Sequence, residues 1–523
     1  MARTSTPTFI VELPLRVPRA ADREMLVRLD LARQLYNACL GDALRRLDLL
    51  QESVAWAQAC AFPKTVGKKL NPKRRDAFTA VRAAHGFTQD ALSAFGTACK
   101  NAAEWNAGRA RSDPRLGAHE TQRIAERAFA AVNRYAYGTQ GRPRFKGKRR
   151  PLHSLEGKSQ ESGITWNAGT GCLEWGALCL RTKLPPDGKD PWLAQALQAR
   201  TKYARIVWRV IKGTRRWFIQ LAQEGQTPLK YQPGPKRRVG LDVGPSTIAV
   251  YGKDHAALVP LAPEVLQPWR EIRRLHRAMD RSRRATNPEC FNADGTFKKG
   301  TTIHVRSVGY HRLRHVIAET ERILAERRER SHGNLANRIL GLGTLIQSET
   351  LSYIAFQKCF GRSTKVRGVG DLMSRIRRKA ARAGGALRDL KTQRLKLSQY
   401  DHLTNTYTKL PLRERWHVLG DGSGVVQRDL YSAFLASVTE TDVLHPSRAR
   451  RAWPAAQSLL GRAGWRRTQP VSVASVLVTA PGLPTPERVA RHRALAREDA
   501  SDGVGARREP KRPAGSGPRT PRR

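Results

Sequence analysis

The segment that most constrains the fold is residues 237–252, RRVGLDVGPSTIAVYG, near the middle of the chain. Apolar side chains fill every second position from residue 239 to residue 243, which is the period of a β-strand. TIAVYG, after a turn, predicts a second strand paired with the first as a hairpin. Asp242 is the only charged residue between Arg238 and Lys253. Because a buried acid is costly unless a cation offsets it, Asp242 is either a turn-capping or salt-bridged side chain, or a carboxylate held on a rigid strand to bind a metal ion.

The net charge indicates the class of partner. The chain has 523 residues, enough for several domains, and its 95 Lys and Arg against 44 Asp and Glu give a formal charge of +51. Such a surplus repels itself strongly without a bound polyanion, and arginine suits phosphate recognition through its planar donor fork. We therefore expect nucleic acid as the partner, with binding that weakens as salt rises. A merely solvated basic surface is the alternative.

Membrane association and disulfide bonds are not expected. No apolar run is long enough to span a bilayer, the N-terminus has no apolar signal core, and no lipid-anchor motif stands out. The seven cysteines are scattered and no two have C-x-x-C spacing, which indicates reduced thiols. We expect a cytoplasmic protein without a membrane partner.

The spacing of apolar residues changes along the chain. Residues 8–18 alternate like a strand, and from Asp22, the candidate N-cap, apolar residues at three- and four-residue steps predict a long helix. Helical patterns continue to about residue 137 and give way to short strand-like runs. One of these, ARIVWRVIKGTRRWFIQLAQEG, predicts two strands joined by a basic hairpin. The Pro- and Arg-rich C-terminal end predicts disorder with nonspecific affinity for polyanions.

Two further acids occupy places that match that of Asp242. Glu349 ends the strand-like TLIQSE, and Asp429 lies between the short strand-like GVV and the helical DLYSAFLA. Carboxylates that converge from strand ends are what a two-metal phosphodiesterase needs, because Mg²⁺ takes oxygen ligands and two such ions stabilise both the attacking and the leaving oxygen. The order Asp, Glu, Asp on this alternating pattern is that of an RNase H-like domain. We predict Asp242, Glu349 and Asp429 as catalytic and metal-binding residues.

These segments resemble TnpB, a family of RNA-guided DNA nucleases of bacterial transposons that is related to type V CRISPR effectors. VGLDVGPSTIAV is similar to the first RuvC motif of that family, LIQSETLSYIAFQK to the second, and GVVQRDLYSAFLA to the third. The runs LARQLYNACLGDALRRL and GRPRFKGKRRPLHSLEGKSQESGI resemble segments of one branch, and the likeness extends from about residue 8 to residue 437. It implies two Mg²⁺ ions in a RuvC site, a guide RNA encoded by the element, and a DNA target that lies next to a short motif.

The resemblance also implies an architecture. We expect a multidomain α+β chain, in which a β-barrel wedge domain with a helical recognition insertion precedes an RNase H-like (RuvC) α/β nuclease domain. The expected boundaries are 1–20 and 138–235 for the wedge, 21–137 for the helical lobe, 236–440 for the nuclease, and 441–523 for a basic, largely disordered tail. Arg428, which precedes Asp429, either contacts a substrate phosphate or forms a structural ion pair.

The sequence departs from the family between the second and third motifs. Relatives carry a zinc ribbon there, with cysteine pairs after KLSQ and after RWH, whereas this chain has no cysteine after Cys359. The remaining candidate ligands are Asp401, His402, His417 and Asp421. Structural zinc sites favour thiolates, and no spacing here matches one, so we expect a degenerate ribbon at 396–425 that holds no zinc. Because a structural zinc supplies much of the folding energy of such a module, its loss bears on activity.

Two functions from different classes follow. The leading prediction is an RNA-guided, Mg²⁺-dependent DNA endonuclease, and the alternative is an RNA-guided DNA-binding protein with weak or no cleavage because the ribbon is lost. A DDE-type transposase would use acids in the order Asp, Asp, Glu, which the observed order disfavours. A general RNA-binding protein explains the charge and leaves the placement of the acids unexplained.

Overall fold

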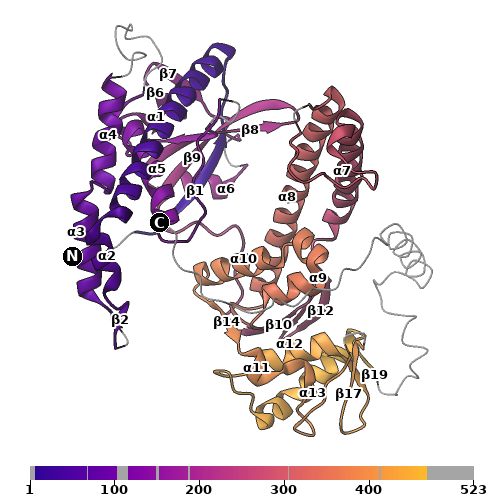
Figure 1. Cartoon of the computed structure of the whole chain (residues 1–523). Coiled ribbons are helices and arrows are strands. Elements are labelled where there is room, and N and C mark those ends of the chain that lie inside the picture. Colours follow the sequence, from indigo (N-terminus) through magenta and orange to yellow (C-terminus); the bar gives the residue numbers. More distant parts are fainter. Residues whose placement is uncertain are drawn as a thin grey trace. The chain divides into compact units, whose positions relative to one another are not determined.

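The computed structural model describes residues 6–67, 69–102, 116–148, 152–186, 189–303, 305–411 and 414–467. The chain divides into two compact units, which Figure 1 colours along the sequence. The first unit comprises Met1–Gln232, Ala262–Gly333 and Ala381–Gly384, and the second comprises Pro233–Leu261, Asn334–Ala380 and Gly385–Arg523. Both units contain helices and strands, so the chain is a mixed α+β multidomain protein, as predicted. The part of the predicted tail beyond residue 467 lies outside the described residues.

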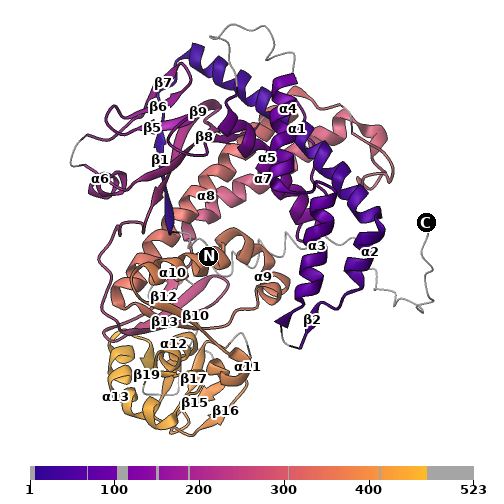
Figure 2. The same ribbon diagram turned by 90° about the vertical axis from the view of Figure 1, so that its left-hand side faces the viewer.

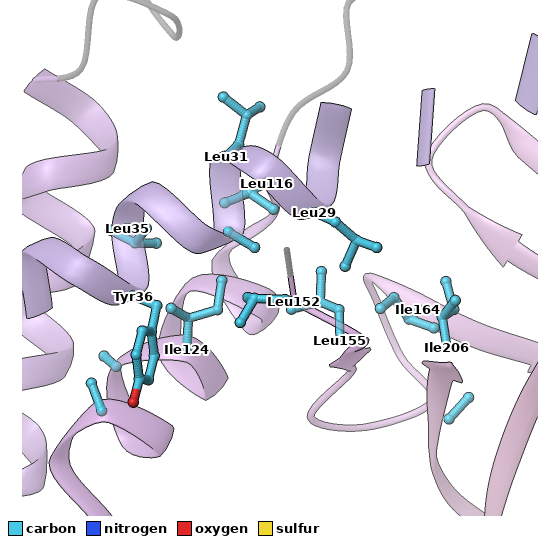
Figure 3. Close-up of a cluster of buried hydrophobic side chains, with 14 of the residues drawn as sticks. Leu29, Leu31, Leu35, Tyr36, Leu116, Ile124, Leu152, Leu155, Ile164 and Ile206 are labelled. Carbon is cyan, nitrogen blue, oxygen red and sulfur yellow. The ribbon is translucent and has the colours of Figure 1, made fainter. Parts of the chain in front are cut away.

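A helical group occupies the N-terminal part of the first unit. Its members are α1 (Arg19–Glu52), α2 (Val54–Ala61), α3 (Pro72–Ala84), α4 (Gln89–Ala102) and α5 (Ala118–Ala136), with the short hairpin β2 (Thr65–Val66) and β3 (Lys69–Leu70) before α3. Helices α1, α4 and α5 lie side by side in both views (Figures 1 and 2), because each buries an apolar stripe. In Figure 3, Tyr36 of α1 lies beside Ile124 of α5, with Leu152 and Leu155 nearby.

The start of α1 differs from the prediction. The helix begins at Arg19, its cap residue is Pro18, and no side chain caps its free N–H groups. Asp22 lies inside the first turn, where its carboxylate accepts hydrogen bonds from Trp217 Nε1 at 2.7 Å and from Arg215 Nη1 at 3.0 Å. The prediction of Asp22 as the N-cap is wrong, because a strand far away in the sequence supplies the partners of that carboxylate.

Strands surround this helical group in the sequence. In one antiparallel sheet the order is β1 (Thr8–Pro14), β9 (Thr214–Glu224), β8 (Thr201–Ile211) and β4 (Ser154–Glu156). A second sheet contains β5 (Ile164–Asn167), β6 (Cys172–Trp175) and β7 (Leu178–Arg181). Positive φ angles at Lys212 and Gly213, 50° and 73°, make the turn of the predicted β8–β9 hairpin. Among the described residues, no strand pairing closes either sheet into a barrel.

The first unit also includes α6 (Pro191–Leu197), α7 (Leu266–Thr286) and the part of α8 (Val308–Leu342) up to Gly333. The basic run predicted as a helix forms α7. No helix within the described residues is both long enough and apolar enough to cross a membrane. All seven cysteines are free thiols.

The second unit is built on a five-stranded sheet in the order β12-β11-β10-β13-β14. Its strands are β10 (Arg238–Val243), β11 (Thr247–Gly252), β12 (His255–Pro260), β13 (Leu345–Glu349) and β14 (Ala386–Leu390). The first two form the predicted hairpin, and β11 pairs with β12 in antiparallel fashion. Strand β13 runs parallel to both β10 and β14. The strand that carries Asp242 is therefore the middle strand of the sheet.

Helices lie on both faces of this sheet. In Figures 1 and 2, α12 (Arg428–Val438) lies on one face and α10 (Val369–Arg382) on the other. Gly240 is the point of closest approach, because a Cβ atom there would overlap the carbonyl oxygen of Ala433 and approach the amide of Ser437. Gly240, two residues before Asp242, therefore lets α12 pack directly on β10.

The remaining elements of the second unit complete the region of the expected ribbon and its surroundings. They are α9 (Tyr353–Arg367), α11 (Thr392–Leu395), β15 (Tyr400–Asp401), β16 (Thr406–Tyr407), β17 (Trp416–Val418), β18 (Val425–Gln427), α13 (Pro446–Arg462) and β19 (Arg466–Arg467). Strands β15 and β16 form one small hairpin, and β17, β18 and β19 form a separate three-stranded sheet. Part of the segment assigned to the tail, 441–523, is thus folded, because α13 buries an apolar face that includes Trp453 and Leu460.

Candidate active site

Asp242 and Glu349 lie at the same level of two neighbouring parallel strands. Leu241 of β10 pairs with Ser348 of β13, so the next residue on each strand is one of the two acids. Side chains at matching positions of parallel strands share a face of the sheet. The sequence predicts a strand that carries each acid, and the structure contains both strands, with Asp242 one residue before the end of β10 and Glu349 at the end of β13.

Asp429 approaches from the helix that covers the same sheet. It is in the first turn of α12, directly after β18, and the contact of α12 with β10 at Gly240 fixes the helix on the sheet. The negative charges of Asp429 and Glu349 both raise the pKa of Asp242, so both acids lie close enough to Asp242 to act on it. The structure therefore brings together the acids that are far apart in the sequence.

The pKa of Asp242 is raised from 3.8 to about 8. Desolvation is the largest cause, followed by the charges of Asp429 and then Glu349. Arg428 and the hydroxyl of Ser432 act in the opposite direction and do not offset these effects. An acid with a strongly raised pKa beside two further acids lacks sufficient positive charge around it, which is typical of a functional site.

The other two carboxylates are held by groups that sequence reasoning does not identify. Glu349 accepts a hydrogen bond from the backbone N–H of Leu397 at 3.2 Å, and burial raises its pKa. Asp429 accepts one from Gln427 Nε2 at 3.3 Å, while Gln427 Oε1 caps α12 by accepting from the N–H of Leu430 at 2.6 Å. The position of Gln427 at the strand-to-helix junction is the only sequence signal for this role.

Arg428 is buried, with 7 % of its surface exposed. Its Nη1 donates to the carbonyl oxygen of Pro411 at 3.2 Å, and its Nε lies 3.6 Å from Asp429 Oδ1. These contacts favour the structural ion pair over contact with a substrate phosphate. Arg415, whose Nη1 lies 3.7 Å from Asp429 Oδ2 and whose side chain is 60 % exposed, is the more accessible cation here.

The chemistry of the three acids fits a divalent cation. Carboxylate oxygens are the ligands that Mg²⁺ prefers, and a cation among the acids would remove the repulsion that raises the pKa of Asp242. The described residues contain no group of three or more His, Cys, Asp or Glu side chains already arranged as a metal site. The fit of Asp242, Glu349 and Asp429 to a cation therefore rests on their charge and donor type alone.

The expected ribbon has a buried polar and aromatic core. Asp401 Oδ2 accepts from the N–H of Gly420 at 2.8 Å and lies 3.3 Å from His417 Nε2, while His402 Nδ1 lies 2.5 Å from the hydroxyl of Tyr431. The rings of His417 and Tyr431 stack with their centroids 4.9 Å apart. Burial opposes ionisation of Asp401, but hydrogen bonds from His417, Gly420 and Leu403 lower its pKa to about 2. Three of the four candidate zinc ligands, Asp401, His402 and His417, therefore engage one another or Tyr431, whereas Asp421 accepts a hydrogen bond from the N–H of Ser423 at 2.9 Å.

Comparison with known proteins does not assign this chain to a family. No protein-family model matches the chain, and no curated protein matches it. The solved structures similar to it include a Cas12f1–sgRNA–target DNA complex at a TM-score of 0.41 and 11% identity, covering 82% of this chain and 98% of that one. A CRISPR–Cas12f ternary complex has a TM-score of 0.27 at 11% identity (82% and 99% covered). A Cas12i–crRNA–dsDNA complex has a TM-score of 0.25 at 9% identity (86% and 65% covered). At TM-scores below 0.5, these likenesses carry no argument about function.

Proposed function

We propose that the chain is an RNA-guided DNA endonuclease that hydrolyses phosphodiester bonds with Mg²⁺ at Asp242, Glu349 and Asp429. The observation that carries the proposal is the placement of the acids. Asp242 and Glu349 follow paired residues of neighbouring parallel strands, Asp429 lies in the first turn of the helix packed on that sheet, and burial and the charges of the other two acids raise the pKa of Asp242. If the three acids had no function, one additional Lys or Arg side chain among them could remove the repulsion that raises the pKa of Asp242. Keeping three acids together costs stability and therefore indicates a function.

The order of the sheet supports an RNase H-like (RuvC) assignment. Three antiparallel strands, β12, β11 and β10, continue into two strands that run parallel to β10, and this is the arrangement expected for that fold. The acids on β10, on β13 and at the start of α12 belong to the three segments that resemble RuvC motifs. The wedge and recognition-lobe assignments of residues 1–235 remain predictions from the same resemblance.

The side chains of the site have separate tasks in this proposal. Bound Mg²⁺ would supply charge stabilisation for the attacking water and the leaving oxygen. Leu397 N–H orients Glu349, and Gln427 orients Asp429 while it caps α12. Asp242 lies on the rigid middle strand and must lose its proton before it can bind a cation. Arg428 neutralises part of the charge from a buried position.

The partners we propose are a guide RNA encoded by the same element and a target DNA. The charge of +51 supports a large polyanionic partner, because a channel for a nucleic-acid duplex needs many basic side chains and few that read bases. The Cas12f1 complex named above contains an sgRNA and target DNA, but the charge and the acids of this chain carry the proposal. Cytoplasmic, nucleoid-associated localisation belongs to the same proposal.

A second candidate function is RNA-guided DNA binding with weak or no cleavage. It is favoured by the absence of cysteines after Cys359, where TnpB relatives hold a zinc ion. Against it, Asp401, His402 and His417 form a buried core with Tyr431, which gives the module a source of stability other than metal. We therefore propose cleavage as the main activity.

The test is guided cleavage by the purified complex. RNA that copurifies with the protein is sequenced, and a DNA library that contains its complement beside randomised flanks is incubated with Mg²⁺. One defined RNA and cleavage of the matched DNA are expected, and Asp242→Ala should abolish cleavage while the complex still binds the target. Asp254→Ala, an exposed acid after β11, is the matched control. A random mixture of cellular RNA would contradict the guided mechanism, and tight binding of matched DNA without cleavage would favour the second function.

A further inference from the structure

A basic hollow lies in the first unit, in the part of the chain before the nuclease segment. Its volume is about 970 Å³, and it is lined by the end of β1, the start of α1 and the β8–β9 turn. The charged residues that line it are Arg16, Arg19, Asp22, Lys183, Arg215 and Arg216. Five of the six are cations, so the hollow attracts anions. None of these residues belongs to the three segments that carry the carboxylates.

The cations of the hollow fall into two groups. Arg215 donates to the carboxylate of Asp22 at 3.0 Å, and Trp217 Nε1 donates to the same carboxylate at 2.7 Å, so the one acid is already engaged. Among the described residues, no ion pair engages Arg16, Arg19, Lys183 or Arg216, which are exposed. These four side chains, called here the rim cations, gather around one hollow without a counter-charge.

The N-terminus of α1 opens into the same hollow. Pro18 and Arg19 line it, and no side chain caps the free N–H groups of this 34-residue helix. Uncapped N–H groups and the positive end of the helix dipole favour an anion, and phosphate is among the anions that such sites bind. The helix start and the rim cations are independent features that point to the same kind of ligand.

We propose that the hollow binds the phosphodiester backbone of a nucleic-acid strand, with the rim cations and the start of α1 contacting successive phosphates. A volume of about 970 Å³ is large enough for more than one phosphate group with its sugar. Trp217 is largely buried and bonded to Asp22, so it shapes the floor and does not offer a face to a base. The site therefore binds without regard to sequence. This proposal rests on the nucleic-acid partner of the proposed function and is independent of the carboxylate site.

The test compares two variants with the same net charge. In the rim variant, Arg16, Arg19, Lys183 and Arg216 are all changed to Gln. In the control variant the four changes to Gln are at Arg45, Arg75, Arg200 and Arg274, which are exposed cations of the same unit. Each control cation has an acid partner, at 2.8 Å, 2.9 Å, 3.7 Å and 2.7 Å respectively. The probes are a fluorescent single-stranded RNA and a DNA duplex, and binding of the full-length protein, stripped of nucleic acid, is measured over a range of salt concentrations.

The rim variant is expected to bind at least one probe more than ~10-fold more weakly than the control variant. Its log–log salt slope for single strands should also fall by about 3, because each lost phosphate contact removes about 0.7. Loss for RNA alone assigns the hollow to the RNA strand, and loss for the duplex alone assigns it to DNA. Equal weakening by the rim and control variants would overturn the proposal, because only net charge would then matter. This binding assay does not depend on cleavage, so failure of the nuclease proposal leaves it interpretable.

A footprint on the unmodified protein provides a second readout if the rim variant does not fold. Acetylation of Lys183 by an amine-reactive reagent is measured by mass spectrometry, before and after nuclease treatment of the copurified complex. Lys299, which is exposed and lies outside the hollow, is the control. Protection of Lys183 that nuclease treatment removes is expected, with less change at Lys299. Equal labelling of Lys183 in both states would contradict the proposal.

Discussion

Two groups of ionisable side chains in the second unit shift the pKa of a carboxylate in opposite directions. Asp401, in the region of the expected ribbon, accepts hydrogen bonds from the N–H groups of Leu403 and Gly420 and lies beside His417. These contacts outweigh burial and lower its pKa to about 2. Asp242 is surrounded by acids, and burial followed by their charge raises its pKa to about 8.

The difference separates a structural acid from a functional one. The protein's own donors satisfy the charge of Asp401, so this side chain stabilises the fold without any ligand. Arg428 and the hydroxyl of Ser432 compensate the charge of Asp242 only in part, which is why we propose that a cation binds there. Hydrogen bonds and aromatic packing stabilise the first region, whereas the proposed function assigns a cation to the second.

The largest expected effect is the loss of cleavage in Asp242→Asn. Asparagine keeps the size of the side chain and removes the negative charge, so the site loses a cation ligand while the strand stays intact. We expect the rate of Mg²⁺-dependent cleavage of matched DNA to fall at least ~10³-fold, with target affinity unchanged. Cleavage at the parent rate would show that Asp242 is not a metal ligand. Asp401→Asn, measured beside it, should reduce cleavage much less at a temperature where the variant is folded.

The second effect concerns how α12 is placed over β10. In Gly240→Ala the new methyl group would overlap the carbonyl oxygen of Ala433, and a backbone group cannot rotate away. Overpacking of this kind costs about 1–3 kcal/mol or more, so a clear fall in Tm and a loss of cleavage are expected together. Gly333→Ala in α8 is the control, because its new Cβ meets nothing within 4 Å and alanine favours a helix. Equal Tm values for the two variants would contradict the close contact.

A smaller effect distinguishes the two acids by stability. Asp401→Asn removes the charge of a carboxylate that accepts hydrogen bonds from three backbone N–H groups, which should lower the free energy of unfolding of the second unit by about 1–3 kcal/mol. Asp242→Asn should leave that free energy unchanged or raise it in the absence of metal, because repulsion between acids is removed. Chemical denaturation without divalent cations measures both. A loss for Asp242→Asn that equals the loss for Asp401→Asn would remove the contrast between the regions.

Zinc chelation tests whether the expected ribbon depends on a metal for its stability. A zinc-selective chelator should leave the Tm of the parent protein unchanged, because Asp401, His402 and His417 are engaged with other protein groups. Elemental analysis that finds one zinc per chain would contradict this account and would point to His402 and His417 as ligands.

The mildest effect is a pH dependence of metal binding. The unfolded chain releases the proton of Asp242 near pH 4, whereas the metal-free folded protein holds it up to about pH 8. Metal-free stability therefore falls as pH rises through this window, and a cation must displace the proton below pH 8. Mg²⁺ affinity should rise with pH up to about 8, and calorimetry at pH 7 in buffers of different ionisation enthalpy should detect about one released proton. Asp242→Asn should release none, and equal proton counts for parent and variant would contradict the assignment.

Many elements of the second unit can be predicted from the sequence, because each is indicated by a pattern of neighbouring residues. The alternation around Asp242, the strand ending in Glu349 and the strand-to-helix change at Asp429 each predict an element that the structure contains. Their convergence was inferred only through the RNase H-like pattern and the family resemblance. The pairing of Leu241 with Ser348 provides the geometric reason, and it depends on a contact between distant segments.

Other features could not be predicted because they depend on contacts between distant residues. Asp22 has the sequence signature of a helix cap. In the structure, however, its carboxylate accepts hydrogen bonds from Arg215 and Trp217 of β9, which are far away in the sequence. Gln427 carries no catalytic signature, and only the folded junction shows that it supports Asp429. The core of the expected ribbon could not be predicted either, because the absence of cysteines there does not say which side chains pack in its interior.

The central claim is that the three acids form a site that a divalent cation completes. Mn²⁺, which substitutes for Mg²⁺ at oxygen ligands and scatters anomalously, tests it in crystals of the parent protein and of Asp242→Asn. The account predicts anomalous density bound by Asp242, Glu349 and Asp429 in the parent protein and weak or no density in the variant. Absence of density among the three acids of the parent at saturating Mn²⁺ would contradict it, whatever the cleavage assays show.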